Sequence, residues 1–230
     1  MPDIIAADAM VVGGVGAAFY KDLGTTVVTP DIARLKRTKG FLLARKERLS
    51  VDPRWYVLMA MVGVAMHQDE NEFMTLVIEG LERNPKNIQL AMMGAVYFLP
   101  KWHGSAEKLE QHARTVADRV AQAGGHGVYF NIYRQAFRLQ YEYDLFKRSN
   151  LDWARMRQDI RDTLGVYPGI ANINVSTMFA CMAGDRKETR RLLKEHRLAY
   201  HKYEWLGDGF YDVCLAWALE SAGGRDTIEH

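Results

Sequence analysis

NIQLAMMGAVYFL, residues 87–99, is the stretch that decides the fold, because apolar side chains surround nearly the whole helix that it predicts. Apart from Asn87 and Gln89, every side chain in this stretch is apolar, small or aromatic. A helix that is apolar on all sides is stable only when other elements cover it. The sequence therefore predicts an interior helix, with further helices packed around it.

Two kinds of predicted helix alternate along the chain. Apolar segments like 87–99 lie near 53–67, 126–146, 170–183 and 209–220. Between them lie amphipathic segments near 69–83, 105–123, 152–165 and 185–199, each with one apolar face at helical spacing. The apolar segments begin 34 to 44 residues apart, which is the range of helix-pair repeats. We expect an all-α fold, an irregular α-solenoid of stacked antiparallel helix pairs.

Helix ends are marked in the sequence as well. A short polar side chain before a helix accepts hydrogen bonds from its first backbone N–H groups, and a glycine often ends the helix. The predicted starts are marked by Thr29 with Pro30, Asp52 with Pro53, Asp69 with Glu72 and Asp185 with Glu188, and the predicted stops by Gly124, Gly165 and Gly184. Strictly alternating apolar and polar runs, which would indicate strands, are absent from the sequence.

The domain organisation follows from these segments. We expect residues 1–28 to form an irregular N-terminal arm, residues 29–222 a single helical-repeat domain, and residues 223–230 a flexible tail. The glycines of Val12-Gly-Gly-Val-Gly16 are weakly similar to a phosphate-binding loop, but the βαβ unit that such a loop needs is missing from the sequence. Nucleotide binding is therefore not expected there.

Three stretches carry a resemblance to helical-repeat proteins. Asn84-Pro-Lys-Asn87 and Tyr167-Pro-Gly169 each precede an apolar helix, as prolines between tetratricopeptide repeats do. The loop Leu99-Pro-Lys-Trp-His-Gly-Ser105 resembles the Pro-(Arg/Lys)-Trp-x-Gly-Ser element of a TPR-like bacterial family of unknown function. This resemblance implies a helical-repeat interaction domain and supplies no catalytic residues.

Composition narrows the class of partner and the compartment. The chain has 30 basic and 28 acidic residues, so its net charge of +2 gives no overall attraction to nucleic acid or to anionic membranes. No run reaches the roughly 18 apolar residues of a membrane span, and no basic segment precedes the apolar run of residues 9–19 as in a signal peptide. We expect a soluble, cytoplasmic chain. The sequence leaves open whether Cys181 and Cys214 are bridged, and whether the chain forms homo-oligomers.

Metal, cofactor and catalytic signatures are weak. The seven histidines lack metal-ligand spacing, since His196 and His201 would point in different directions on one helix. We therefore expect neither a metal site nor a cofactor, and no catalytic residue is assigned. The alternative that we keep is an enzyme whose site is assembled from loops around Trp102 and His103.

A second alternative is nucleic-acid binding through two basic helices, 34–48 and 186–202. Segment 69–82 is correspondingly acidic, so charge pairing between helices explains the basic residues equally well. Aromatic side chains that could stack on bases are not interleaved with the basic ones. Nucleic acid is therefore not the expected partner.

The expected function is that of a non-catalytic adaptor that holds a protein or peptide on the concave face of a helical repeat. Segment 126–146 is rich in tyrosine and phenylalanine, and one such stripe could line a groove. Polar residues on otherwise apolar helices are the other candidates for contact. The predicted partner-binding residues are Trp102, His103, Tyr129, Tyr133, Arg134, Asn172 and Asn174.

Overall fold

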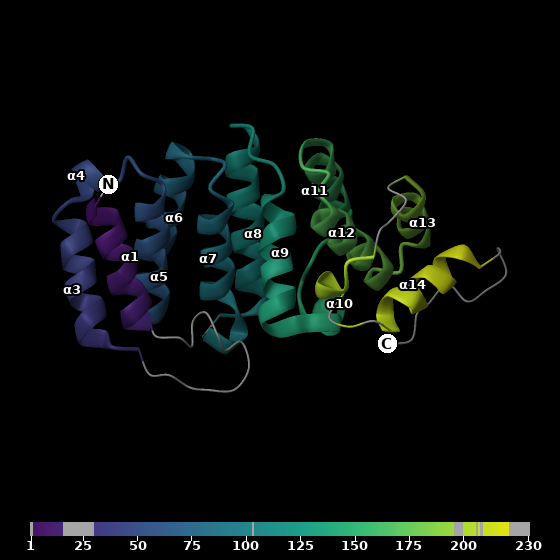
Figure 1. Cartoon of the computed structure of the whole chain (residues 1–230), viewed down its shortest axis with the longest axis horizontal. Coiled ribbons are helices and arrows are strands. Elements are labelled where there is room, and N and C mark those ends of the chain that lie inside the picture. Colours follow the sequence, from purple (N-terminus) through teal and green to yellow (C-terminus); the bar gives the residue numbers. More distant parts are fainter. Residues whose placement is uncertain are drawn as a thin grey trace. The chain divides into compact units, whose positions relative to one another are not determined.

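The computed structural model describes residues 2–15, 30–102, 104–195, 200–205, 207 and 209–220. Over these residues the chain is helical, and none of them belongs to a strand. The chain divides into two compact units, residues 1–140 and residues 141–230, and each unit has its own packed helices (Figure 1). The all-α class that the sequence predicts is therefore confirmed, whereas the expected single helical-repeat domain over residues 29–222 stays a prediction.

The first unit is built around a row of three apolar helices that alternate along the chain with amphipathic ones. Its helices are α1 (Pro2–Val15), α3 (Ile32–Leu43), α4 (Lys46–Leu49), α5 (Arg54–Ala65), α6 (Glu70–Arg83), α7 (Ile88–Phe98), η1 (Pro100–Trp102), α8 (Ala106–Ala121) and α9 (Val128–Ala136). Helix α7 packs against both α5 and α9, while α6 and α8 pack on this row and on each other. In α5 every side chain from Trp55 to Val64 is buried. In the first unit the apolar segments are thus interior helices, as their sequences indicate.

The N-terminal segment differs from the expected irregular arm, because residues 2–15 form α1. Ile4, Ala7 and Val11 are buried on one face of α1, which packs against α3 and α5. A Cβ at Gly14 would lie 2.8 Å from the Leu35 side chain, so the glycine permits close helix packing. The glycines that weakened the helix signal in the sequence therefore serve the packing of two helices. Residues 16–29 lie outside the described residues.

The helix caps follow the predicted chemistry at two of the marked starts. Asp69 accepts hydrogen bonds from the backbone N–H groups of Asn71 and Glu72 at 2.9 and 3.2 Å. Asp185 accepts one from Glu188 N–H at 3.0 Å. Helix α3, in contrast, begins after Asp31 and not after Thr29, which lies outside the described residues.

The predicted stops are confirmed in two of three cases. Gly124 and Gly184 follow α8 and α12, with φ angles of 75° and 70° that favour glycine. Gly165 instead lies inside α11, which continues to Val166.

The boundary between the units falls inside the predicted helix 126–146. The α-helical pattern ends at Ala136 and is followed by a π-helical turn η2 (Phe137–Tyr141), a 3-10 turn η3 (Glu142–Asp144) and the short α10 (Leu145–Arg148). Glu142 adopts a positive φ of 47°, which a regular helix does not allow. Apolar periodicity continues through this region, so the sequence pattern does not show the break.

The second unit is built around α12 (Ile170–Met182). Helices α11 (Trp153–Val166), α13 (Arg186–Glu195) and α14 (Gly209–Leu219) pack on α12, as does the short η4 (Lys202–Glu204). A disulfide between Cys181 and Cys214 joins α12 to α14, with the two Cα atoms 5.9 Å apart. This answers the question that the sequence leaves open about the two cysteines. Over the described residues, no helix combines the length and the hydropathy that a bilayer span requires.

Candidate binding cleft at Trp102

A cleft of about 160 Å³ opens in the first unit where the end of α5, the start of α6, α7, η1 and the start of α8 meet. We call it the Trp102 cleft. Its aromatic wall consists of Tyr97, Phe98 and Trp102. His67, Glu70 and Lys108 supply its polar side chains. The cleft thus joins an apolar surface to groups of both charges.

The aromatic wall is fixed in place by stacking and by one hydrogen bond. The ring of Tyr97 stacks on Phe73 with 4.1 Å between the ring centroids, and it meets the edge of Phe98 at 4.9 Å. Its hydroxyl donates to the Gln68 carbonyl oxygen at 2.6 Å, and burial raises the pKa of this hydroxyl. The tyrosine therefore offers the cleft an immobile ring rather than a reactive phenolate.

Trp102 is the exposed part of the wall. Its side chain is 38% exposed, although large aromatic side chains are usually covered in folded chains. The loop that carries it is well braced, since Trp102 N–H donates to the Leu99 carbonyl at 2.8 Å. Next to it, the Lys101 ammonium donates to the Leu139 carbonyl at 2.6 Å, and burial lowers the pKa of that ammonium. An exposed tryptophan on a rigid loop is typical of a contact residue.

Gly104 allows the loop to lie directly against α7. A Cβ at this position would come within 1.9 Å of the Phe98 carbonyl oxygen. The Gly104 N–H donates to the Leu99 carbonyl at 3.1 Å, and Ser105 then caps α8 by accepting from Lys108 N–H at 3.2 Å. The Trp-x-Gly-Ser sequence thus turns the chain tightly from η1 into α8 and sets the position of Trp102.

An ion pair crosses from α6 to α8 at the cleft. Lys108 Nζ lies 2.6 Å from Glu70 Oε2, and this hydrogen bond raises the pKa of the lysine. The two side chains are 48% and 43% exposed, so water screens their attraction. Because the pair is weak, a ligand that offers groups of both charges can separate it.

The size of the cleft limits what it can hold. Sites for drug-sized ligands and cofactors have volumes of roughly 300–1,000 Å³, and the Trp102 cleft is smaller than the lower end of this range. Over the described ranges of the chain, no three His, Cys, Asp or Glu side chains are grouped to hold a metal ion. The cleft suits one inserted side chain better than a whole cofactor.

Tyr129 and Tyr133, two of the predicted contact residues, are fully buried and do not line an open groove. Their hydroxyls both donate to Glu110 Oε2, at 2.8 and 2.5 Å, and burial raises the pKa of Tyr133. The expectation that they face a partner is wrong, because this buried carboxylate from α8 occupies their polar ends. Arg134 follows on the same helix and is half-buried.

Asn174 is likewise a structural residue. It is fully buried, and its Oδ1 accepts from the Trp205 indole N–H at 2.8 Å and from His201 N–H at 3.1 Å. It therefore holds the segment 200–205 against α12 and is not available to a partner. Asn172 is half-buried and donates to the Tyr167 carbonyl at 3.0 Å, which supports the turn between α11 and α12.

Several cations of the two predicted basic helices are engaged within the chain. In the first helix, Lys46 pairs with Glu79 at 2.9 Å and Arg48 pairs with Asp3. In α13, Arg191 pairs with Glu188 at 2.6 Å. A basic side chain that is paired with a carboxylate adds little to the positive potential that would attract the phosphates of a nucleic acid. Pairing within the chain thus accounts for these three cations, and nucleic-acid binding through 34–48 or 186–202 stays an untested alternative; residues 196–199 lie outside the described residues.

Of the predicted contact residues, the structure brings only Trp102 to the cleft, and His103 lies outside the described residues. Glu70, Tyr97 and Lys108 come from three different helices, and sequence reasoning missed them. The signal that could have pointed to Tyr97 is its hydroxyl, which needs a partner on an otherwise apolar helix.

No protein-family model, no curated protein and no solved structure matches the chain. The resemblance to a TPR-like family stays a prediction.

Proposed function

We propose that the chain is a peptide-binding module, and that the Trp102 cleft receives one apolar side chain of an extended segment from a partner protein. The observation that carries this proposal is the exposure of Trp102 on a braced loop beside an aromatic wall. Binding energy at protein interfaces concentrates in such places, where an anchor side chain enters a fixed apolar pocket.

The charged rim supports a peptide as the ligand. Glu70 and Lys108 sit beside the same cleft and now satisfy each other. A peptide with one basic and one acidic residue next to its anchor can replace this pair by two intermolecular pairs. Such pairs contribute mainly to orientation and selectivity, while the anchor contributes most of the affinity.

We also propose that the helices form an irregular, TPR-like solenoid. The support is the alternation in the first unit, where α5, α7 and α9 form one row and α6 and α8 pack alongside it. Helix-pair repeats commonly bind extended peptides. Of the residues that the sequence predicts for partner contact, the proposal keeps Trp102 and does not use Tyr129 and Tyr133.

A titration with minimal probes tests the cleft directly. We expect N-acetyl-leucinamide at millimolar concentration to shift the NMR signal of the Trp102 indole N–H, whereas N-acetyl-glycinamide, which has no anchor side chain, leaves it in place. The indole signal of Trp205, which is buried, serves as the internal control. Equal shifts with both probes, or no shift with either, would contradict the proposal.

A further inference from the structure

The last helix, α14, is only thinly attached to the second unit. Of its eleven residues, only Cys214, Trp217 and Ala218 are buried. Val213 and Leu219 are exposed apolar residues on the same helix. An isolated helix of this length is not stable in water. Helix α14 therefore depends on the bonds that hold it to the rest of the unit.

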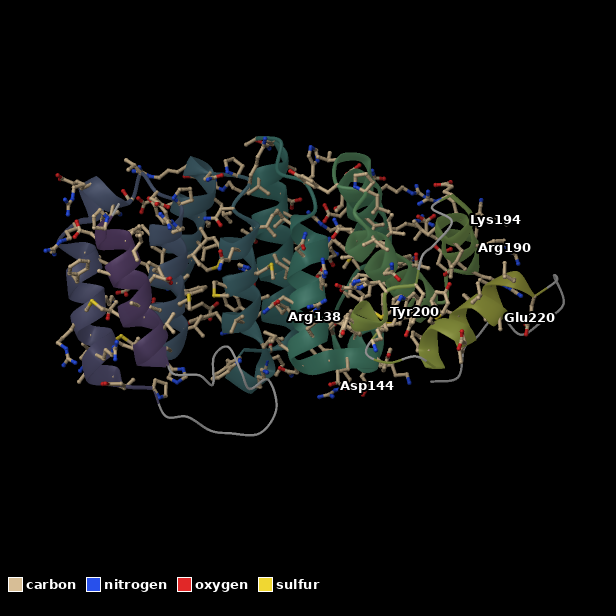
Figure 2. All side chains as sticks on the ribbon, in the orientation of Figure 1. Arg138, Asp144, Arg190, Lys194, Tyr200 and Glu220 are labelled. Carbon is tan, nitrogen blue, oxygen red and sulfur yellow. A yellow bond between two sulfur atoms is a disulfide. The ribbon has the colours of Figure 1, made fainter. Side chains whose placement is uncertain are left out.

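Non-covalent contacts hold α14 mainly near its two ends. At its start, Phe210 lies 4.7 Å from Tyr143 between ring centroids, and Tyr211 lies 5.2 Å from Trp205. At its end, Arg190 on α13 donates to the carbonyl oxygens of Ala218 and Glu220 at 2.7 and 3.1 Å. Figure 2 labels Arg190 on α13 and Glu220 just beyond α14. In the middle of the helix, the disulfide from Cys214 to Cys181 on α12 is a covalent attachment.

We propose that this disulfide is a redox latch, which keeps α14 docked on α12 while it is oxidised and lets α14 open when it is reduced. The bond closes a loop of chain between residues separated by 33 positions. Cross-links of this kind strongly disfavour open states of the enclosed segment. Without the bond, docking rests on three buried side chains, of which one is the cysteine itself, and on the ring contacts and arginine hydrogen bonds near the two ends of the helix.

The redox step requires a dithiol reductant. A thiolate of the dithiol attacks one sulfur of the Cys181–Cys214 bond, that bond breaks, and a mixed disulfide forms while the other cysteine leaves as a thiolate and takes up a proton. The second thiol of the reductant then attacks the mixed disulfide and releases the second cysteine as a thiol. Two electrons and two protons pass to the protein, and the reductant becomes a disulfide.

Burial makes this exchange depend on the opening of α14. Cys181 and Cys214 are 0% and 1% exposed, so a reductant reaches a sulfur only during brief partial openings of α14 that the intact disulfide still allows. Once reduced, the helix closes again only through its non-covalent contacts. The latch therefore resists brief exposure to thiols and responds to sustained reduction.

Opening of α14 changes the surface of the second unit. Trp217 loses its cover, and Arg186 and Arg190 lose the carbonyl oxygens that they now contact at the end of α14. Arg186 also lies 5.7 Å from the centre of the Trp217 ring, so both groups are uncovered together. The reduced form thus presents an apolar ring next to positive charge.

Whether the disulfide is reduced depends on the cellular compartment in which the chain works. Disulfides are rare in the cytoplasm, and those that occur there are usually transient or redox-sensing. In a reducing compartment the Cys181–Cys214 bond can act as a latch, whereas in an oxidising compartment it would stay closed.

Hydrogen exchange measured by mass spectrometry on the full chain tests the latch. We expect treatment with dithiothreitol to speed the exchange of the amides in 209–219 by on the order of a hundredfold, while α5 and α7 in the first unit exchange as before. Reoxidation should restore the slow rate. Unchanged exchange in 209–219 after complete reduction, verified by the mass of alkylated cysteines, would overturn the proposal.

Two variants separate the latch from general destabilisation. Cys181→Ser with Cys214→Ser should show fast exchange in 209–219 without reductant, and dithiothreitol should have no further effect. Val213→Ser changes an exposed residue of the same helix, keeps the disulfide and should behave like the unaltered chain. If the double variant exchanges fast in the first unit as well as in 209–219, the disulfide supports the whole fold and is not a latch.

Discussion

Lys108 of α8 and Glu70 of α6 meet beside the Trp102 cleft, with Nζ and Oε2 2.6 Å apart. The pair joins the two amphipathic helices that flank α7, and both side chains remain about half exposed. A pair in water contributes little to stability, because screening and side-chain entropy oppose it. Its position therefore matters more for what the cleft selects than for the fold.

Reversal of this pair should change selectivity without loss of fold. In Glu70→Lys with Lys108→Glu the ion pair can re-form, so we expect an unchanged helical circular-dichroism signal. The peptides that bind should show the opposite order of acidic and basic residues around the anchor, and an original peptide should bind roughly tenfold more weakly. Competition between a peptide and its charge-swapped version measures the change. If the order of charges in bound peptides does not respond, the pair takes no part in recognition.

Gly104→Ala should damage the loop that positions Trp102. The added Cβ would lie 1.9 Å from the Phe98 carbonyl oxygen, so the backbone must shift. We expect a loss of about 1–3 kcal/mol in the free energy of unfolding, as for other overpacked sites. The matched control is Gly165→Ala in α11, where a Cβ meets no atom within 4 Å and a gain of about 0.5–1 kcal/mol is expected. Urea titrations of both variants measure the two free energies of unfolding. If both substitutions change this free energy equally, the close contact between position 104 and the Phe98 carbonyl does not determine the stability of the loop.

His112 should make the stability depend on pH in a defined window. Burial lowers the pKa of this histidine from 6.5 to about 4, while its Nε2 lies 3.3 Å from the Ala91 carbonyl oxygen. Between these two values the unfolded chain binds the proton more readily than the folded chain. The stabilisation is therefore complete above pH 6.5 and falls by about 3 kcal/mol as the pH drops to 4.

The pH dependence can be assigned with two variants. His112→Gln should lose the decline between pH 6.5 and 4, although it is less stable at neutral pH. His126→Gln alters an exposed histidine and should keep the decline. Chemical denaturation at several pH values measures both. A decline that persists in His112→Gln would assign the effect to other groups.

Glu110 should be essential to the core between α8 and α9. In Glu110→Ala, the buried hydroxyls of Tyr129 and Tyr133 lose their common acceptor, and we expect a loss of about 2–4 kcal/mol. Tyr133→Phe removes one donor and should cost only about 1 kcal/mol. Gln111→Ala, at an exposed position of the same helix, is the control. A small effect of Glu110→Ala would mean that water replaces the carboxylate.

The sequence predicts the fold well where periodicity and caps agree. Helix α6 begins at Glu70 after the predicted cap at Asp69, and α7 matches the apolar stretch almost residue for residue. Prediction fails in α1, where the glycines that look like breakers are packing contacts against α3. It also fails after Ala136. The apolar pattern of the sequence continues through the π-helical turn at this point, so the pattern does not reveal that the chain changes direction there.

The site is less predictable than the fold. Trp102 stands out because a tryptophan in a polar loop is unusual, and the structure does expose it. Glu70 and Lys108 resemble any other charged residues on amphipathic helices, and only packing of α6 on α8 brings them together. Large aromatic rings occur both in protein cores and at binding surfaces, so the sequence does not show which role Tyr129 and Tyr133 have.

Selection of random peptides on the full chain, followed by affinity measurements with Trp102→Ala, tests the central claim most directly. We predict that the enriched peptides share one apolar anchor, and that their affinity falls at least tenfold in Trp102→Ala. Tyr203→Ala, which alters a more exposed aromatic residue of the other unit, should leave the affinity unchanged. Peptides that bind Trp102→Ala as tightly as the unaltered chain would contradict the assignment of the Trp102 cleft as a peptide site.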